Sequence, residues 1–291
     1  MPNANQLAPA WSITRANMLR SCPRAYGLYY HDSIGGWIEN AAPFTRWAWA
    51  LKKLITRQTW AGRIVHDLMA GYFTVRKAGA AMVPIQALLA RAKSRLRREY
   101  AISSQISFPA PPHKCSLVEH YFKITTTRDE WASLASMVYS ALGNAFSDPR
   151  LSSLHAKATS ILEVHAKPEP FLYAPDRYCY VSLDLAFRMG KLYLFDWKTT
   201  SDHPDLVPNL QSLFAHRKWG VPLHDIKHVS LNLVTGEAAT TVPTPGSLRL
   251  ALAKIDQELG EMLKLQGVPG SKLEPRKGEA CSTCPFQKIC R

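Results

Sequence analysis

The last eleven residues of the chain, CSTCPFQKICR, contain three of its 6 cysteines. Cys281, Cys284 and Cys290 have the spacing C-x2-C-x5-C, which supplies three thiolates. Metal centres with cysteine ligands mostly use four ligands. Clustered cysteines in a reducing compartment favour a metal over disulfides. The sequence therefore predicts a metal-binding segment whose fourth ligand comes from elsewhere in the chain, which constrains the fold more than any other feature.

The compartment and the class of partner follow from composition. The N-terminus, MPNANQLAPAWSITR, lacks the basic and apolar regions of a secretory signal, and no apolar run approaches the ~20 residues of a membrane span. We therefore expect a cytoplasmic protein with no membrane partner. The net charge is +14, from 36 Lys+Arg against 22 Asp+Glu. Such a surplus indicates a polyanionic partner, and nucleic acid is the main candidate.

Hydrophobic periodicity predicts a mixed α/β chain with a helical first half. We expect a first segment, 1–35, with a helix at 12–30 whose apolar face carries Cys22, capped by Ser12 or Thr14. A helical region, 36–158, follows, and then a core of sheet and helices, 159–265, and a cysteine segment, 266–291, all forming one structural unit. The predicted helices are 44–76, 85–100, 128–146, 205–219 and 246–265, and the predicted strands are 161–173, 178–187, 191–198 and 228–234.

Two carboxylates and a lysine lie on a predicted β-hairpin. The runs YCYVSLDLAF and KLYLFDWK are joined by a tight turn that includes Gly190, which brings Asp184 on the first strand near Asp196 and Lys198 on the second. Charges near a sheet core are costly and are usually kept for chemistry or for firm pairing. Metal-assisted phosphodiester hydrolysis uses such a trio, because two carboxylates hold Mg²⁺ and a lysine positions the attacking water. The alternative is a solvent-facing pair at a strand end.

Three further features are weaker by themselves. His66 lies one turn after Gly62 on a predicted helix, where its ring could reach a metal, although a lone histidine there is more often a buried hydrogen-bonding residue. Gln211 could orient a water or a phosphate, or it could be a surface amide. A basic stripe from Arg91 to Arg98 could track phosphates, although a charge run is usually a solvated helix face.

Together these motifs resemble the PD-(D/E)XK nuclease superfamily, in its RecB-like, exonuclease V-like branch, which carries an iron–sulfur cluster and includes the CRISPR-associated nuclease that trims prespacers. The matching motifs run in order along almost the whole chain. They are LRSCP at Leu19–Pro23, Gly62 with His66, Asp184, Asp196 with Lys198, Gln211, and the C-terminal C-x2-C-P-x4-C.

The resemblance implies a restriction-endonuclease-like core, with a mixed central sheet flanked by helices and a helical N-terminal insertion. It implies a [4Fe–4S] cluster held by Cys22, Cys281, Cys284 and Cys290 as a clip between the termini. It also implies Mg²⁺- or Mn²⁺-dependent hydrolysis of DNA, exonucleolytic and on single strands, in recombination, repair or CRISPR adaptation, beside a helicase or another partner protein. The implied metal ligands are His66, Asp184, Asp196 and the backbone carbonyl of Trp197; Lys198 and Gln211 are the implied catalytic groups, and Glu163 is a weaker candidate.

The sequence departs from the family pattern at three places, which concern the handling of DNA. Val181 replaces a glycine, Leu185 replaces an arginine, and Ala215, beside Phe214, replaces a tyrosine. These changes leave the metal ligands and the lysine in place. Two other functions stay open: a catalytically idle nucleic-acid-binding subunit of a larger complex, and a binding protein stabilised by a four-cysteine zinc site.

Overall fold

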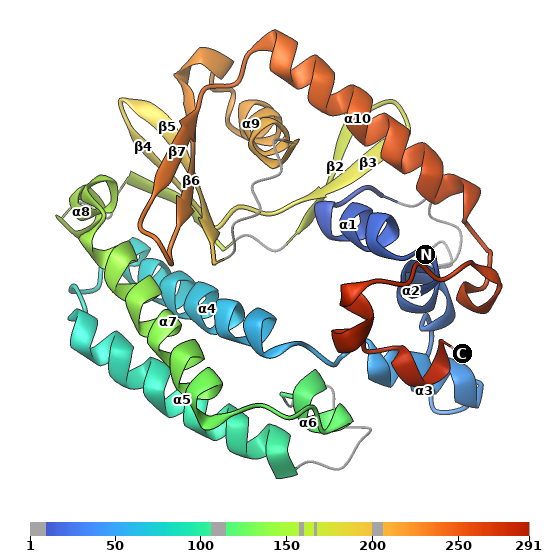
Figure 1. Cartoon of the computed structure of the whole chain (residues 1–291). Helices are drawn as coiled ribbons and strands as arrows, with labels where there is room; N and C mark the ends of the chain where they lie inside the picture. Colours follow the sequence, from blue (N-terminus) through green and yellow to red (C-terminus); the bar gives the residue numbers. More distant parts are fainter. Residues whose placement is uncertain (1–9, 106–114, 157–159, 166–167, 200–205, 291) are drawn as a thin grey trace. The chain divides into compact units, whose positions relative to one another are not determined.

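The computed structural model describes residues 10–105, 115–156, 160–165, 168–199 and 206–290. The chain is mixed α/β and divides into two compact units, each assembled from segments that are distant in the sequence (Figure 1). One unit contains Met1–Trp60, Arg97–Arg128 and Gln257–Arg291, and the other contains Ala61–Leu96 and Asp129–Asp256. The first predicted segment and the last, the two that carry the cluster cysteines, belong to the same unit.

The second unit is built on a five-stranded mixed sheet with the strand order β1-β4-β5-β6-β7. Its strands are β1 (Ile161–Val164), β4 (Leu185–Met189), β5 (Lys191–Lys198), β6 (Ile226–Asn232) and β7 (Ala238–Thr241). Only β5 and β6 are parallel, and α9 (Leu206–Trp219) supplies the crossover that parallel neighbours need. The apolar residues of β5, Leu192, Leu194, Phe195 and Trp197, are almost fully buried, so the core of this unit surrounds that strand.

A two-stranded sheet, β2 (Glu169–Ala174) with β3 (Arg177–Val181), accompanies the main sheet. Helix α9 contacts both β6 and β3, and its residues 209–215 are all buried, so it lies between the two sheets (Figure 1). The rest of the unit is formed by most of α4 (Arg57–Lys77) and α10 (Pro245–Lys264), the first part of α5 (Ile85–Gln105), α7 (Arg128–Ser147) and α8 (Pro149–Ala156).

The other unit is helical. It contains α1 (Ile13–Ser21), α2 (Pro23–Gly27), a π-helical turn (Leu28–Asp32), α3 (Pro43–Leu51) and α6 (Val118–Phe122), together with the ends of α4, α5 and α10. Short 3-10 turns at Gly270–Lys272, Glu279–Thr283 and Gln287–Ile289 complete it. As expected, Ser12 caps the first helix, because its side chain accepts a hydrogen bond from the Arg15 amide.

Four predicted elements were wrong in detail. The strand at 161–173 is two strands, β1 and β2, which belong to different sheets. The helix at 12–30 breaks at Cys22, whose extended backbone separates α1 from α2, because a residue before proline is disfavoured in the helical region. The helix at 44–76 is broken between α3 and α4. The strand at 178–187 ends at Val181 and resumes at Leu185, so β3 and β4 belong to different sheets and Asp184 lies just before a strand.

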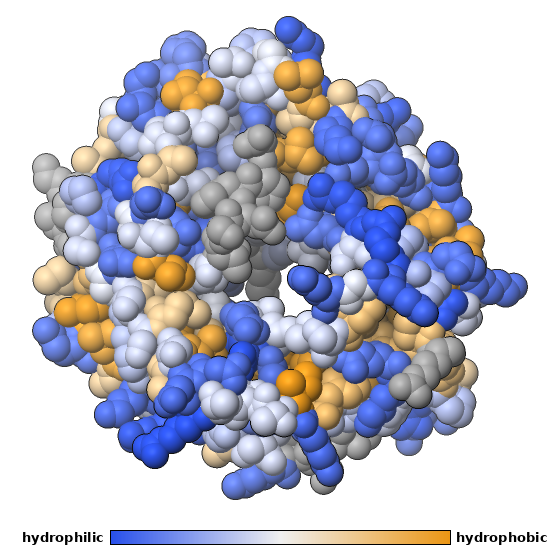
Figure 2. Space-filling model, viewed as in Figure 1, coloured by the Kyte–Doolittle hydropathy of each residue, from blue (hydrophilic) through white to orange (hydrophobic). Residues whose placement is uncertain are grey.

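The surface agrees with the composition. Hydrophilic side chains predominate on the face shown in Figure 2, and hydrophobic ones are scattered among them. Among the helices in the described ranges, none combines the length and the hydropathy that a membrane crossing requires.

Candidate active site and candidate metal centre

The hairpin of β4 and β5 brings the two predicted carboxylates together. Gly190 adopts a positive φ of 69° in the turn, a conformation that glycine tolerates without steric cost. The strands then pair with Leu185 opposite Phe195, so that Asp184, one residue before β4, comes opposite Asp196. Asp184 and Asp196 are mutual electrostatic neighbours, because the charge of Asp184 raises the pKa of Asp196.

Asp184 is fixed by hydrogen bonds from both sides. Its Oδ2 accepts a hydrogen bond from the backbone amide of Trp197 at 2.8 Å, and its Oδ1 lies 3.2 Å from His66 Nδ1. Burial raises the pKa of the Asp184 carboxyl, but the charge and hydrogen bond of His66, with the Trp197 amide, outweigh burial and hold that pKa below its ordinary value. Asp184 is therefore an ionised carboxylate whose orientation is set by its surroundings.

The pKa of Asp196 is shifted in the opposite direction from that of Asp184. Its side chain is buried, and its Oδ2 forms an ion pair with Lys198 Nζ. Burial, and then the charge of Asp184, raise the pKa of Asp196 to about 6, although Lys198 and His66 act against that rise. Asp184 and Asp196 therefore repel each other when both are ionised, and this repulsion favours the binding of a cation between them.

Helix α4 carries His66, whose ring lies beside the Asp184 carboxylate. Its buried residues include Ile64, Val65 and Phe73, and Phe73 stacks on Trp197 with 6.2 Å between ring centroids. Burial lowers the pKa of His66, but the charges of Asp184 and Asp196 outweigh that effect and leave it raised. The helix also approaches the end of β5 closely: a Cβ at Gly62 would lie 2.7 Å from Thr199 Oγ1, so the space beside this glycine is occupied by Thr199.

The structure places the other predicted residues as follows. Gln211 is buried on α9, so it is not a surface amide, and its side chain bonds to the Ser182 carbonyl and to His228. Glu163 on β1 forms an ion pair with Lys218 at 3.1 Å. Glu163 therefore pairs with a lysine that is not part of the site formed by Asp184 and Asp196.

Two histidines near the site were missed in the sequence. His165 lies after β1 with a positive φ of 44°, and its Nδ1 is 4.0 Å from Asp184 Oδ1. His228 is completely buried on β6 and bonds to Gln211. The sequence showed only His165 inside the predicted strand 161–173 and His228 at the start of the predicted strand 228–234, and a histidine in a strand is too common to single out.

The donors of this site fit a hard divalent cation in kind. Carboxylate oxygens are the ligands that Mg²⁺ and Mn²⁺ prefer, and a bound cation would relieve the repulsion between Asp184 and Asp196. In the described parts of the chain, no three His, Cys, Asp or Glu side chains converge as a ready metal site. Here the carboxylates are paired with His66 and Lys198 instead.

The repulsion between the carboxylates predicts a stability effect. The raised pKa means that folded Asp196 still binds a proton, between pH ~4 and ~6, that the unfolded chain has released. The free energy of unfolding therefore falls as pH rises through that window. Asp196→Asn resembles the neutral acid, so we expect the metal-free variant to be more stable than wild type by about 1–3 kcal/mol at pH 8, and by less at pH 5.

Urea unfolding in EDTA at the two pH values measures this difference. Asp225→Asn is the matched control, because Asp225 is a partly exposed carboxylate beside Lys191 and His224, and it should change stability by less than about 0.5 kcal/mol. An Asp196→Asn protein that is less stable than wild type at pH 8 contradicts the assignment of a buried, repelling pair.

The four cysteines of the terminal motifs line one cavity, although in the described structure they are not drawn together as a ready metal site. Cys22 lies between α1 and α2, rather than on the apolar face of one helix as predicted, and its side chain is partly exposed. Its Sγ accepts hydrogen bonds from the Ala25 amide at 3.5 Å and from the Arg276 amide at 3.4 Å. Two backbone N–H groups, one from each end of the chain, therefore point at this sulfur.

One cavity of about 960 Å³ is lined by Cys22, Cys281, Cys284 and Cys290. Burial and the charges of the other three cysteines together raise the pKa of Cys284 to about 11, although the Phe286 amide acts against that rise. The other three sulfurs therefore lie within electrostatic reach of Cys284. The donor set, four thiols from opposite ends of the chain around one cavity, fits an iron–sulfur cluster or a structural zinc in kind. Cys115 and Cys179 are buried elsewhere.

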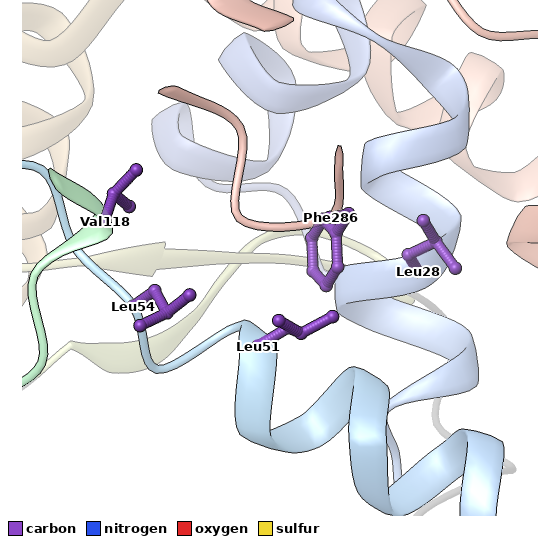
Figure 3. Packing of buried hydrophobic residues seen from close by; sticks show 5 residues of the cluster. All are labelled: Leu28, Leu51, Leu54, Val118 and Phe286. Carbon is purple, nitrogen blue, oxygen red and sulfur yellow. The ribbon is translucent and has the colours of Figure 1, made fainter. Parts of the chain in front are cut away.

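Protein contacts already hold the terminal segment beside the first helices. Phe286 is almost fully buried in a cluster with Leu28, Leu51, Leu54 and Val118, and Figure 3 shows its ring pointing between the side chains of Leu28 and Leu51. Polar contacts add to this packing: Arg24 donates to the Leu273 carbonyl at 2.8 Å, and the Gly270 amide donates to Asp32 at 2.8 Å. The cavity therefore has walls that do not depend on a bound group.

No protein-family model matches the chain, and a comparison with curated proteins also finds no match.

Proposed function

We propose that this protein is a metal-dependent nuclease of the PD-(D/E)XK type that hydrolyses DNA, exonucleolytically and on single strands. The observation that carries the proposal is the pair of carboxylates, buried Asp196 and largely buried Asp184, of which Asp196 pairs with Lys198 and Asp184 with His66. The mixed five-stranded sheet with an α9 crossover supports the choice of this fold family.

The residues take separate roles in the proposed reaction. Asp184, Asp196, His66 and the Trp197 carbonyl would hold Mg²⁺ or Mn²⁺. When bound, the ion supplies a Lewis acid that polarises a phosphoryl oxygen and lowers the pKa of the attacking water. Lys198, which forms an ion pair with Asp196, would orient that water and offset negative charge as the phosphate is attacked. The Trp197 amide fixes Asp184 through its hydrogen bond, so the carboxylate needs little reorganisation to bind.

Helix α5 provides a candidate track for the DNA backbone. Its buried line, Leu88, Ala92 and Leu96, is flanked by one basic stripe of Arg91, Arg95 and Arg98 and by another of Lys93 and Arg97. Arg95 is half-buried and forms an ion pair with Asp67 at 2.6 Å, whereas the other four are exposed. The exposed pairs are therefore better candidates for phosphate contacts than Arg95.

These stripes allow a matched electrostatic test. DNA affinity should fall with salt by roughly 0.7 log units per log unit of salt for each phosphate engaged on a single strand. We expect Arg91→Gln with Arg98→Gln to reduce that slope by about 1.4. Lys93→Gln with Arg97→Gln removes the same charge from the other side of the helix and serves as the control.

Fluorescence anisotropy of a labelled oligonucleotide, in EDTA and over a range of salt concentrations, gives both slopes. A lower slope for the first pair alone places the DNA along Arg91 and Arg98. Equal slopes for wild type and for both double variants would make α5 a solvated face and would place the phosphate contacts elsewhere.

The four cysteines around the cavity would hold a [4Fe–4S] cluster that secures the C-terminal segment to the first two helices. The donor set supports this assignment, and the packing of Phe286 supports a structural rather than a catalytic role for the segment. The proposed setting is recombination, repair or CRISPR adaptation, beside a helicase or another partner protein.

End-labelled single-stranded, duplex and circular DNA, each incubated with Mn²⁺ and with EDTA, tests the proposed function. We expect Mn²⁺-dependent shortening of the linear single strand, with slower loss of the duplex and an intact circle. Cleavage of the circle would make the enzyme an endonuclease. Binding without cleavage of any substrate would contradict the nuclease proposal and favour a catalytically idle binding subunit.

A further inference from the structure

A completely buried histidine lies beside the candidate active site on β6. His228 occupies the position opposite Leu194 on β5, two residues before Ser230, which pairs with Asp196. Its Nε2 lies 2.5 Å from Gln211 Oε1. Burial, and then the charge of Lys198, lower the pKa of His228 to about 3, so its ring is neutral at pH 7. Because an amide oxygen only accepts hydrogen bonds, the proton of this neutral ring must be on Nε2.

A buried histidine at this position of the sheet costs folding free energy. In the described part of the chain its Nδ1 finds no hydrogen-bond partner, and a buried acceptor left in that state costs free energy. A hydrophobic residue at the same position would avoid that cost. The hydrogen bond to Gln211 is therefore what the residue contributes.

Gln211 connects His228 to the segment that carries Asp184. Its Nε2 donates to the backbone carbonyl of Ser182 at 2.8 Å, while its Oε1 is held by His228. The His228 proton thus determines which way the amide faces, because a flipped amide would set two oxygens against each other at Ser182 and two N–H groups against each other at His228.

The segment needs such an anchor because it is irregular. Ser182, Leu183 and Asp184 lie between β3 and β4, and these two strands belong to different sheets. Gln211 holds the Ser182 carbonyl, and the His165 amide donates a hydrogen bond to the Asp184 carbonyl at 2.8 Å. The position of the Asp184 carboxylate therefore depends on contacts outside the strand ladder.

We propose that His228 and Gln211 act as a positioning pair, which fixes the Ser182–Asp184 segment and so holds the Asp184 carboxylate where it meets the Trp197 amide and the metal. The proposal rests on the proposed function only in taking Asp184 as a metal ligand. It gives Gln211 a different role from the one that the family resemblance implies, because the amide acts on Asp184 rather than on water or phosphate.

Direct binding of Mn²⁺ tests the pair without any cleavage. We expect Gln211→Leu and His228→Leu each to weaken Mn²⁺ binding about tenfold, the lower range for residues that orient metal ligands. The double variant should be no weaker than the worse single variant, because both substitutions break one chain of contacts. Loss of the free Mn²⁺ signal in electron paramagnetic resonance measures the affinities. His228→Gln keeps an N–H donor and should restore most of the binding.

Cleavage kinetics separate positioning from a direct role. At saturating Mn²⁺ the two single variants should have similar kcat values, because the defect of each lies in metal affinity. If Gln211→Leu lost kcat at saturating Mn²⁺ while His228→Leu did not, Gln211 would act on the substrate and the proposal would be wrong. Additive losses of Mn²⁺ affinity in the double variant would also overturn it.

A metal-free measurement distinguishes this proposal from the nuclease assignment. In protein labelled with ¹⁵N-tryptophan, the Trp197 amide proton, assigned with Trp197→Phe, reports its hydrogen bond to Asp184. We expect this signal to shift in both single variants but not in Ser212→Ala, the control, whose buried hydroxyl on the same helix bonds only to the Pro208 carbonyl among the described residues. An unchanged Trp197 signal in Gln211→Leu and His228→Leu overturns the proposal, whatever the protein does to DNA.

Discussion

Asp196→Ala and Lys198→Ala are each expected to reduce DNA cleavage by at least about a thousandfold and to change DNA affinity by less than about threefold. Asp196 is a proposed metal ligand, and Lys198 is its ion-pair partner. Removing the carboxylate leaves one buried acid to hold the metal, and removing the lysine leaves the water without an orienting cation. DNA affinity should persist because it comes from many dispersed cations of a chain with net charge +14.

The matched control is Lys191→Ala. Lys191 lies on the same strand, but it is exposed and pairs with Asp225 at 3.6 Å. Cleavage rates at saturating Mn²⁺ and oligonucleotide affinities in EDTA give the comparison. If either active-site variant cut DNA at a rate close to that of wild type, the catalytic centre would have to be sought elsewhere.

Much of the fold could be predicted from local patterns. Strand β5 and helix α10 were recognised nearly to their ends, because alternation and an amphipathic repeat are properties of neighbouring residues. The breaks were less visible. Cys22 lies in an otherwise helical pattern, and only the following proline signals that the helix must stop there.

The division of the run 178–187 shows a second limit. Alternating side chains indicate an extended chain but do not reveal that Val181 and Leu185 belong to two different sheets. The strand β7, with the short sequence AATT, lacks the apolar pattern of a buried strand and was missed. Both errors concern pairing between strands, which depends on tertiary contacts rather than on local sequence.

Motifs identified most of the candidate site residues, but the contacts between these residues could not be derived from the sequence. His66 and Asp184 lie 118 residues apart in sequence, so their contact follows from the fold and not from any spacing. The link between His228 and Gln211 had no motif at all. In a strand that reads HVSLNLV, a histidine is a weak signal, and only the buried hydrogen bond reveals that it faces the helix.

Cys22→Ala, Cys284→Ala and Cys290→Ala are each expected to give colourless, poorly soluble protein with little nuclease activity. All three residues line one cavity, although Cys22 is more than 250 residues from the others in sequence. A cluster that joins Cys22 to Cys281 closes a long loop, on the scale of a long-loop disulfide at ~4–5 kcal/mol, and the metal–ligand free energy adds to that amount. For a chain of this size the melting temperature should fall by about 10 °C or more.

The other two cysteines provide the controls. Cys115 and Cys179 are buried, and Cys179 lies on β3 with its thiol directed to the Phe171 carbonyl at 3.6 Å, so Cys115→Ala and Cys179→Ala should remain brown and active. Iron and zinc content, melting temperature and cleavage rate are to be measured for all five variants. A wild-type protein that is colourless and holds zinc would make the site a zinc clip. A brown Cys22→Ala protein would remove Cys22 from the ligands. A colourless one that melts and cuts like wild type would mean that the contacts of Phe286 and Arg24 hold the terminal segment without any bound group.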